Sequence, residues 1–217
     1  MEATARRTFD RPPPSLISQI HIVNQPPEAE IQNAHVVCVI LDPWLKNIAW
    51  VFNFSYPAGK WDAWGLPGGR RDKNDRTLWH TAAREAEEET GITVKNLGLI
   101  LEGSVYDTRT DTYFWRAVFL CVAATPGDPA IQARDEKTGA LQTRGFRWFP
   151  RGIAPSIGQT VDGKVVAEKV YPTHAETIID PYVTQAIERA ENSFGDDVRA
   201  LALNEPWQRV AQQHLSS

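Results

Sequence analysis

The chain has 217 residues, of which 42% are hydrophobic, and its formal net charge at pH 7 is −4. This length suits one domain with extensions, and the acidic balance argues against a surface built to bind long nucleic acid, which needs a basic patch. No uncharged apolar run approaches the roughly 18 residues of a membrane span and no signal peptide is visible, so we expect a cytoplasmic protein in which Cys38 and Cys121 are reduced and buried.

The first part of the chain is predicted to hold an N-terminal arm followed by strands. Residues 1–14 are polar and end in three prolines, which predicts a flexible arm, and residues 15–24 form a candidate first strand. The β-branched run from His35 to Leu41 is typical of a central strand that is buried on both faces. Residues 48–54 form the next predicted strand, and Trp64-Gly65-Leu66-Pro67 then enters a glycine turn.

A helix is predicted to begin near Asp75 or Arg76 and to run to about Thr90. Apolar residues recur there at helical spacing, and Gly91 can end the helix because glycine adopts the left-handed conformation without steric cost. The helix carries three glutamates on one face, Glu85, Glu88 and Glu89.

Like charges at this spacing repel one another, and locally only Arg84, four residues before Glu88, opposes that repulsion. An acidic run on a helix is most often a solvated face. A divalent cation would also remove the repulsion, and Mg²⁺ is usually held by a few carboxylates together with substrate phosphates.

After this helix, the sequence predicts further strands and then two helices. One or two strands are predicted over residues 92–106, followed by a hairpin turn at 107–111, a long strand over 112–124, a polar loop over 125–140 and a short strand over 145–150. An Asp-Gly turn predicts a small hairpin over residues 159–166, and Asp180-Pro181 and Asn204-Glu205-Pro206 are helix starts. We divide the chain into an arm of residues 1–14, a domain of residues 15–195 that includes the late hairpin, and a helical extension of residues 196–217.

The glycine turn and the acidic helix together resemble the Nudix box, in which a Gly is followed by a Glu and then by Arg-Glu-apolar-x-Glu-Glu-x-Gly-apolar. The match from Arg84 to Ile92 is complete. The first half departs from the pattern, because Arg76 stands where the family has its first Glu and Gly69 lies one residue further back. The loop over residues 68–75 looks like that of the coenzyme A pyrophosphatase branch, but the Leu-Thr-x-Arg segment of that branch is missing.

The resemblance implies an α/β/α sandwich around a mixed central sheet, with Mg²⁺, or alternatively Mn²⁺, as cofactor. The metal ligands that it implies are Glu85, Glu88, Glu89 and the backbone carbonyl of Gly69. Arg84 would belong to the catalytic site by orienting a glutamate. Asp72 or Asp75 could stand in for the glutamate that is missing at Arg76.

The general base is left open between two residues. Family members often take it from a late-loop glutamate, at a position that Gln142 occupies here. Glu136, with Asp135 beside it, is the nearest acidic alternative. If neither serves, a glutamate of the box, Glu85 above all, must also act as base.

Four residues near the turn are candidates for binding substrate. Arg70 and Arg71 follow the second glycine and could contact phosphates. The aromatic faces of Trp64 and Trp148 could stack on a base, although each of them also suits a place in the core.

Two functions remain to be separated. The first is an Mg²⁺-dependent pyrophosphohydrolase that cleaves a small substrate in which a nucleoside diphosphate is linked to another moiety; a homodimer is compatible with it. The second is a Nudix-fold module that binds a nucleotide or a protein without cleaving it, which the departures at Arg76 and Gln142 favour. The intact acidic cluster speaks against the second, because a pure binder gains nothing from mutually repelling carboxylates.

Overall fold

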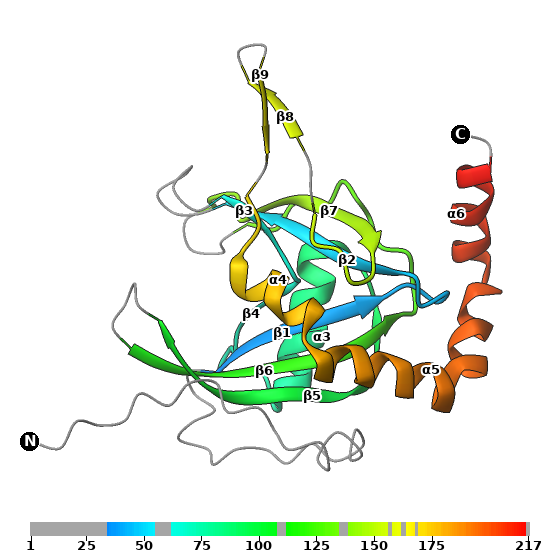
Figure 1. Cartoon of the computed structure of the whole chain (residues 1–217), viewed down its shortest axis with the longest axis horizontal. Helices are drawn as coiled ribbons and strands as arrows, with labels where there is room; N and C mark the ends of the chain where they lie inside the picture. The colour runs from blue at the N-terminus through cyan, green and yellow to red at the C-terminus, as the bar shows by residue number, and fades with distance from the viewer. Residues whose placement is uncertain are drawn as a thin grey trace, which may run out of the picture.

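The computed structural model describes residues 34–54, 62–107, 112–134, 139–155, 158–161, 164–167 and 169–215. The predicted arm, the candidate first strand over residues 15–24 and most of the predicted turn at 107–111 lie outside these residues. A seven-stranded mixed sheet forms the centre of the molecule, with helices on both of its faces (Figure 1). The predicted α/β class is therefore confirmed. Among the described residues, we find no helix that could span a lipid bilayer.

Strand β1, His35–Leu41, is the centre of the sheet, as its sequence predicts. It pairs in parallel with β6, Thr112–Ala123, which in turn pairs antiparallel with β5, Val94–Asp107. Because β5 is one continuous strand, the alternative of two strands in this region is wrong.

The other edge of β1 is shared between two strands. β2, Asn47–Asn53, meets β1 only where Leu41 lies opposite Ile48, whereas β4, Gly68–Arg70, pairs with residues 35–37. β2 then extends the sheet through β3, Ala63–Gly65, and β7, Thr143–Pro150. This branching places the glycine turn, which joins β3 to β4, beside the start of β1.

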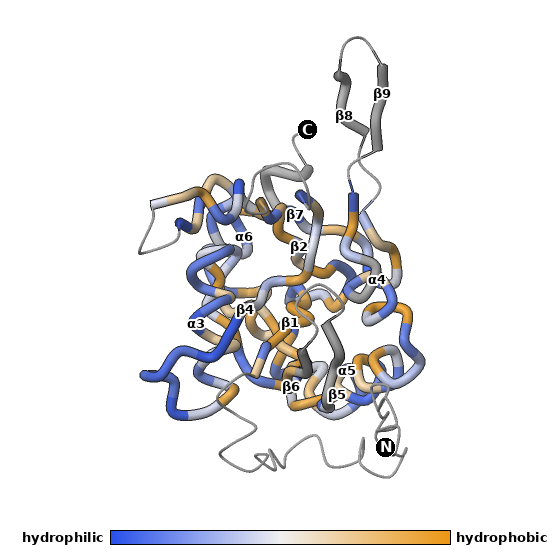
Figure 2. Tube along the Cα trace, turned by 90° about the vertical axis from the view of Figure 1, so that its left-hand side faces the viewer, coloured by the Kyte–Doolittle hydropathy of each residue, from blue (hydrophilic) through white to orange (hydrophobic). Residues whose placement is uncertain are grey.

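Alternate residues of β1 supply two hydrophobic cores, one on each face of the sheet. Val37, Val39 and Leu41 pack with α5, Pro181–Ala202. Val36, Cys38 and Ile40 pack with α3, Leu78–Thr90. Figure 2 shows the hydrophobic stretches gathered along these central strands. Cys38 and Cys121 are both free and buried, as predicted.

Helix α3 begins at Leu78, so its predicted start near Asp75 or Arg76 is two to three residues too early. The physical reason is the N-cap, because the side chain of Thr77 accepts a hydrogen bond from the backbone N–H of His80. Its end is as predicted: Gly91 is left-handed, with φ 66°, and its N–H donates to the carbonyl of Glu87.

The C-terminal part contains one helix that the sequence pattern did not predict, α4, Pro172–Ile179. The predicted cap at Asp180 is present and starts α5, which continues without a break past residue 195, our sequence-based boundary. The predicted hairpin is β8, Gly158–Val161, with β9, Lys164–Ala167, and it stands out from the body in Figure 1.

Helix α6, Glu205–Leu215, is fixed to the body through Trp207. This side chain is 1% exposed, its ring contacts those of Trp44 and Trp148, and its indole N–H donates to the carbonyl of Ala124 at 3.3 Å. A buried aromatic of this kind contributes both apolar area and a satisfied polar group.

We predict that Trp207→Ala lowers the free energy of unfolding by about 3–5 kcal/mol, because it leaves a cavity and removes a hydrogen bond. Urea denaturation measures this value. Arg209→Ala changes an exposed residue of the same helix and should alter the free energy by less than about 0.5 kcal/mol. Similar small losses for both variants would show that α6 is not packed as described.

Candidate active site

The glycine turn touches two glutamates of α3. The backbone N–H of Gly68 donates to Oε2 of Glu89 at 2.9 Å. The carboxylate of Glu85 occupies the space beside Gly69, where an added Cβ would lie 2.3 Å from its Oε1. A Cβ on Gly68 would lie 2.1 Å from the carbonyl oxygen of Val36. Gly68 is therefore required by its close approach to the backbone of strand β1, and Gly69 leaves room for the carboxylate of Glu85.

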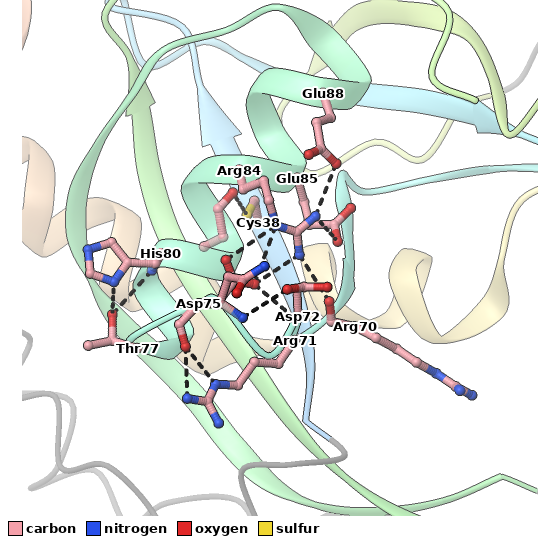
Figure 3. A network of polar contacts seen from close by, with 12 residues as sticks. Cys38, Arg70, Arg71, Asp72, Asp75, Thr77, His80, Arg84, Glu85 and Glu88 are labelled. Carbon is pink, nitrogen blue, oxygen red and sulfur yellow. Dashed lines mark hydrogen bonds and ion pairs between the residues drawn. The ribbon is translucent and has the colours of Figure 1, made fainter. Parts of the chain in front are cut away.

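Arg84 joins the loop before α3 to the acidic face of the helix (Figure 3). Its guanidinium lies 2.9 Å from Oε1 of Glu85 and 3.0 Å from Oε2 of Glu88. It also donates to Oδ2 of Asp75 at 3.0 Å and to the carbonyl of Arg70 at 3.1 Å. This arrangement suits the orienting role that the resemblance implied for Arg84.

Asp75 is the acidic residue of the loop that contacts Arg84. It is buried, and its Oδ2 also accepts from the backbone N–H of Asp72 at 2.9 Å. Burial by itself would raise the pKa of Asp75, but these hydrogen bonds lower the pKa below its ordinary value. Oδ1 of Asp72 instead accepts a hydrogen bond from the backbone N–H of Asn74. Arg76 is exposed. Of the two substitutes considered, the structure places Asp75 at the network.

The two inner glutamates resist ionisation. Burial raises the pKa of Glu85 to about 7, and repulsion by Glu88 adds to this, while Arg84 opposes it. Burial also raises the pKa of Glu89 well above its ordinary value, with a further contribution from the charge of Glu85 and an opposing one from the Gly68 N–H. A bound cation would remove the cost of ionising both groups together.

The donor chemistry at this site fits a divalent cation, because carboxylate and carbonyl oxygens are the ligands that Mg²⁺ prefers. The structure brings Glu85 and Glu89 together beside the glycine turn. Glu88 is half-exposed and is engaged by Arg84. In the described part of the chain, no three acidic, histidine or cysteine side chains are already grouped as a metal site. Glu88 would therefore have to turn from Arg84 to join the other two.

The residues predicted to bind substrate lie in different surroundings. Arg70 is exposed, and its side chain points away from the network in Figure 3. The guanidinium of Arg71 donates to the backbone carbonyl of Asp75 at 2.8 Å and thus holds the loop. Trp64 is 3% exposed and packs on Phe52 and Phe149.

Trp148 packs on Phe146 and Trp207 in the core on the α3 face. The contacts of both tryptophans in the structure are packing contacts, and their stacking on a base stays a prediction. Glu136 lies outside the described residues, so its predicted role as base stays a prediction.

Sequence reasoning missed a support of the glycine turn that α4 supplies. His174 accepts a hydrogen bond from the backbone N–H of Leu66 at its Nδ1 atom, at 2.9 Å, and the N–H of Tyr171 donates to the carbonyl of Trp64. An added Cβ on Gly65 would lie 2.9 Å from the ring of Tyr171. The available signal was Pro172, because proline favours the first position of a helix.

We predict that Asp75→Asn lowers the free energy of unfolding at pH 7 by about 1–3 kcal/mol, because it removes a buried charge-assisted bond to Arg84. A group whose pKa is lowered by folding contributes stability above its ordinary pKa and loses it as pH falls. The difference from the unmodified protein should therefore shrink below about pH 4. Arg76→Gln, at the exposed neighbour, is the control. An equal loss in both variants would contradict the assignment of Asp75.

Comparisons with known proteins identify the family of the chain. The model of the NUDIX domain matches residues 32–169, while a comparison with curated proteins gave no match. Three solved structures illustrate the resemblance. A NUDIX hydrolase from Nitrosomonas europaea shares 17% identity over 74% of this chain and 88% of its own, with a TM-score of 0.42.

A MutT NUDIX hydrolase from Burkholderia pseudomallei shares 17% identity over 72% of this chain and 95% of its own, with a TM-score of 0.46. An ADP-ribose pyrophosphatase from Streptococcus suis shares 14% identity over 75% of this chain and 94% of its own, with a TM-score of 0.46. Because the domain model covers more than half of the chain and includes the glycine turn and α3, the chain belongs to the Nudix hydrolase family.

Proposed function

We propose that the protein is an Mg²⁺-dependent pyrophosphohydrolase that cleaves a nucleoside diphosphate linked to another moiety. The observation that carries the proposal is the placement of Glu85 and Glu89 against the glycine turn, where burial and mutual repulsion disfavour their ionised forms. Such a pair is unfavourable to the free protein and becomes favourable when a cation binds. Family membership supports the reaction class.

Each residue of the site has a distinct part in this proposal. Mg²⁺, when bound, would neutralise phosphate oxygens and lower the pKa of an attacking water. Glu85, Glu89 and the carbonyl of Gly69 would hold it, with Glu88 as a further ligand. Arg84 keeps Glu85 in place through their 2.9 Å contact. Asp75 holds Arg84, so the loop and the helix keep one relative position.

Two residues remain candidates for the general base. A base works best with a pKa near the working pH, and the raised pKa of Glu85, about 7, meets this condition in the free protein. Glu136 is the alternative from the sequence. The choice between them decides whether one glutamate both holds the cation and takes the proton.

A module that binds without cleaving is the second candidate. Gln142, which cannot act as a base, and the engagement of Glu88 by Arg84 favour it. The two inner glutamates argue against it, because binding alone does not require carboxylates that repel each other in a buried place.

An assay panel separates the two functions. Nucleotide sugars, dinucleotides, nucleoside triphosphates and coenzyme A are incubated with Mg²⁺ or Mn²⁺, and products are resolved by chromatography. The hydrolase should release a mononucleotide from at least one diphosphate-linked compound, and EDTA should stop the release. Calorimetric binding of a compound that is never cleaved would favour the module.

We predict that Mg²⁺ raises the thermal midpoint at pH 8, because a ligand of the folded state contributes about 2.7 kcal/mol at one hundred times its dissociation constant. For a chain of this size that corresponds to roughly 5–10 °C. Without metal, carboxylates whose pKa is raised by folding should make stability fall as pH rises from about 4.5 through 7. The Mg²⁺ effect should therefore be larger at pH 8 than at pH 5, as differential scanning fluorimetry can measure.

Glu89→Gln should abolish the Mg²⁺ response and leave the metal-free protein at least as stable at pH 8, because it removes a buried charge. Glu87→Gln, at an exposed position of the same helix, is the matched control and should keep the response. A full Mg²⁺ response in the Glu89→Gln variant would contradict the assignment of α3 as the metal site.

A last prediction distinguishes the base. If Glu136 is the base, Glu136→Gln should lower kcat by about 10² to 10⁴ at saturating Mg²⁺ while the Mg²⁺ requirement stays unchanged. Glu85→Gln should change both kcat and the requirement, since Glu85 also holds the cation. A Glu136→Gln enzyme with full kcat between pH 6 and 9 would leave Glu85 as the base.

A further inference from the structure

Arg116 is a buried cation that the active-site network does not use. Arg116 lies on β6 and is 8% exposed, and its Nε atom has no hydrogen-bond partner among the described residues. Its guanidinium has one hydrogen bond among the described residues, a long one of 3.4 Å to the hydroxyl of Thr177 on α4. No carboxylate in the described ranges forms an ion pair with it. A buried guanidinium without an anion is unfavourable.

In the described part of the chain, the surroundings of Arg116 add a further hydrogen-bond donor but no close counter-charge. Burial lowers the pKa of Arg116 to about 10, and only Glu176, which is exposed and makes no ion pair with it, opposes this. His174, on α4, accepts from Leu66 at Nδ1, so its ring proton lies on Nε2 and can be donated. Burial and the nearby charges of Arg116 and His35 lower the pKa of His174 well below its ordinary value.

The strand pairing places Arg116 level with Arg70, which follows the glycine turn. His35 of β1 lies opposite Arg70 of β4 on one side and opposite Arg116 of β6 on the other. Because the alternate residues Val37 and Val118 belong to the core beneath α5, Arg116 lies on that face. Glu85 and Glu89 come from α3, which packs on the opposite face.

We propose that Arg116, together with Thr177 and His174, binds a phosphate group of a ligand. A guanidinium matches two phosphate oxygens with parallel hydrogen bonds, and the hydroxyl and the imidazole N–H are further donors. A metal ion is excluded by the positive charge of the cluster.

The identification of this phosphate as part of the substrate rests on the proposed function. β4 and β6 are separated by about 10 Å, two strand spacings. Because the two sites lie on opposite faces, a further phosphate of a substrate whose scissile diphosphate lies at the glycine turn would reach Arg116 around the start of β1.

The test uses inorganic phosphate as the probe and EDTA to exclude metal. The thermal midpoint of the full chain is followed against phosphate concentration, with sodium chloride at equal ionic strength as reference. The unmodified protein should be stabilised by phosphate, and Arg116→Met should lose that response. Arg147→Met, at an exposed position on β7, is the control and should keep it.

A second readout separates binding from a structural role. Arg116→Met should be at least as stable as the unmodified protein when no phosphate is present, because it replaces an unpaired buried charge with an apolar chain of similar length. A less stable variant would overturn the proposal, and so would an unmodified protein that phosphate does not stabilise. If the Met variant fails to fold, Arg116→Lys should bind phosphate at least tenfold more weakly, and equal binding would overturn the proposal.

Kinetics distinguish this proposal from the reaction itself. With a cleaved substrate, Arg116→Met should raise KM at least tenfold while kcat and the Mg²⁺ requirement stay unchanged. Phosphate binding through Arg116 in a protein that hydrolyses nothing would contradict the proposed function and leave this inference standing. An unchanged KM in the Arg116→Met variant would show that this site does not bind the substrate.

Discussion

The contact between the glycine turn and helix α3 is the constraint on which the site depends. A backbone N–H of the turn holds Glu89, and the missing side chain of Gly69 makes room for Glu85. The contact exists because β4 pairs with the first residues of β1 while α3 packs on the same strand. A side chain at position 68 would meet the backbone of β1, and one at position 69 would displace the carboxylate of Glu85 from its place beside the turn.

Two buried ionisable groups lie on opposite faces of the sheet: the acidic pair, which Arg84 offsets only in part, and Arg116, with which no described carboxylate forms an ion pair. The acidic pair on the α3 side is suited to a cation, and Arg116 on the α5 side is suited to an anion. Each lowers the stability of the free protein relative to an apolar replacement. If both proposals hold, the protein is most stable when both a metal and a phosphorylated ligand are bound.

The sequence predicts most of the sheet and the acidic face because these depend on local patterns. The run from His35 to Leu41 has the predicted bounds, since a strand buried on both faces needs β-branched residues throughout. The role of Asp75 was visible only as one of two alternatives, because the choice depends on which carboxylate the loop turns toward Arg84. A helix start depends on a single cap, which is why α3 begins at Leu78 rather than Asp75.

Other features depend on contacts between distant segments and could not be predicted in this way. Trp64 packs on Phe149 and Trp148 packs on Trp207, so each of these contacts joins parts of the chain that lie far apart in the sequence. The surroundings of Arg116 likewise depend on α4, a helix that the sequence pattern did not predict and whose Thr177 contacts the guanidinium.

The most direct test of the account is the position of a bound cation. Mn²⁺ scatters anomalously and takes the same oxygen ligands as Mg²⁺, so crystals grown with Mn²⁺ locate it without a substrate. The account predicts an anomalous peak within coordination distance of the carboxylates of Glu85 and Glu89. A peak elsewhere, with these two carboxylates unliganded at saturating Mn²⁺, would contradict it.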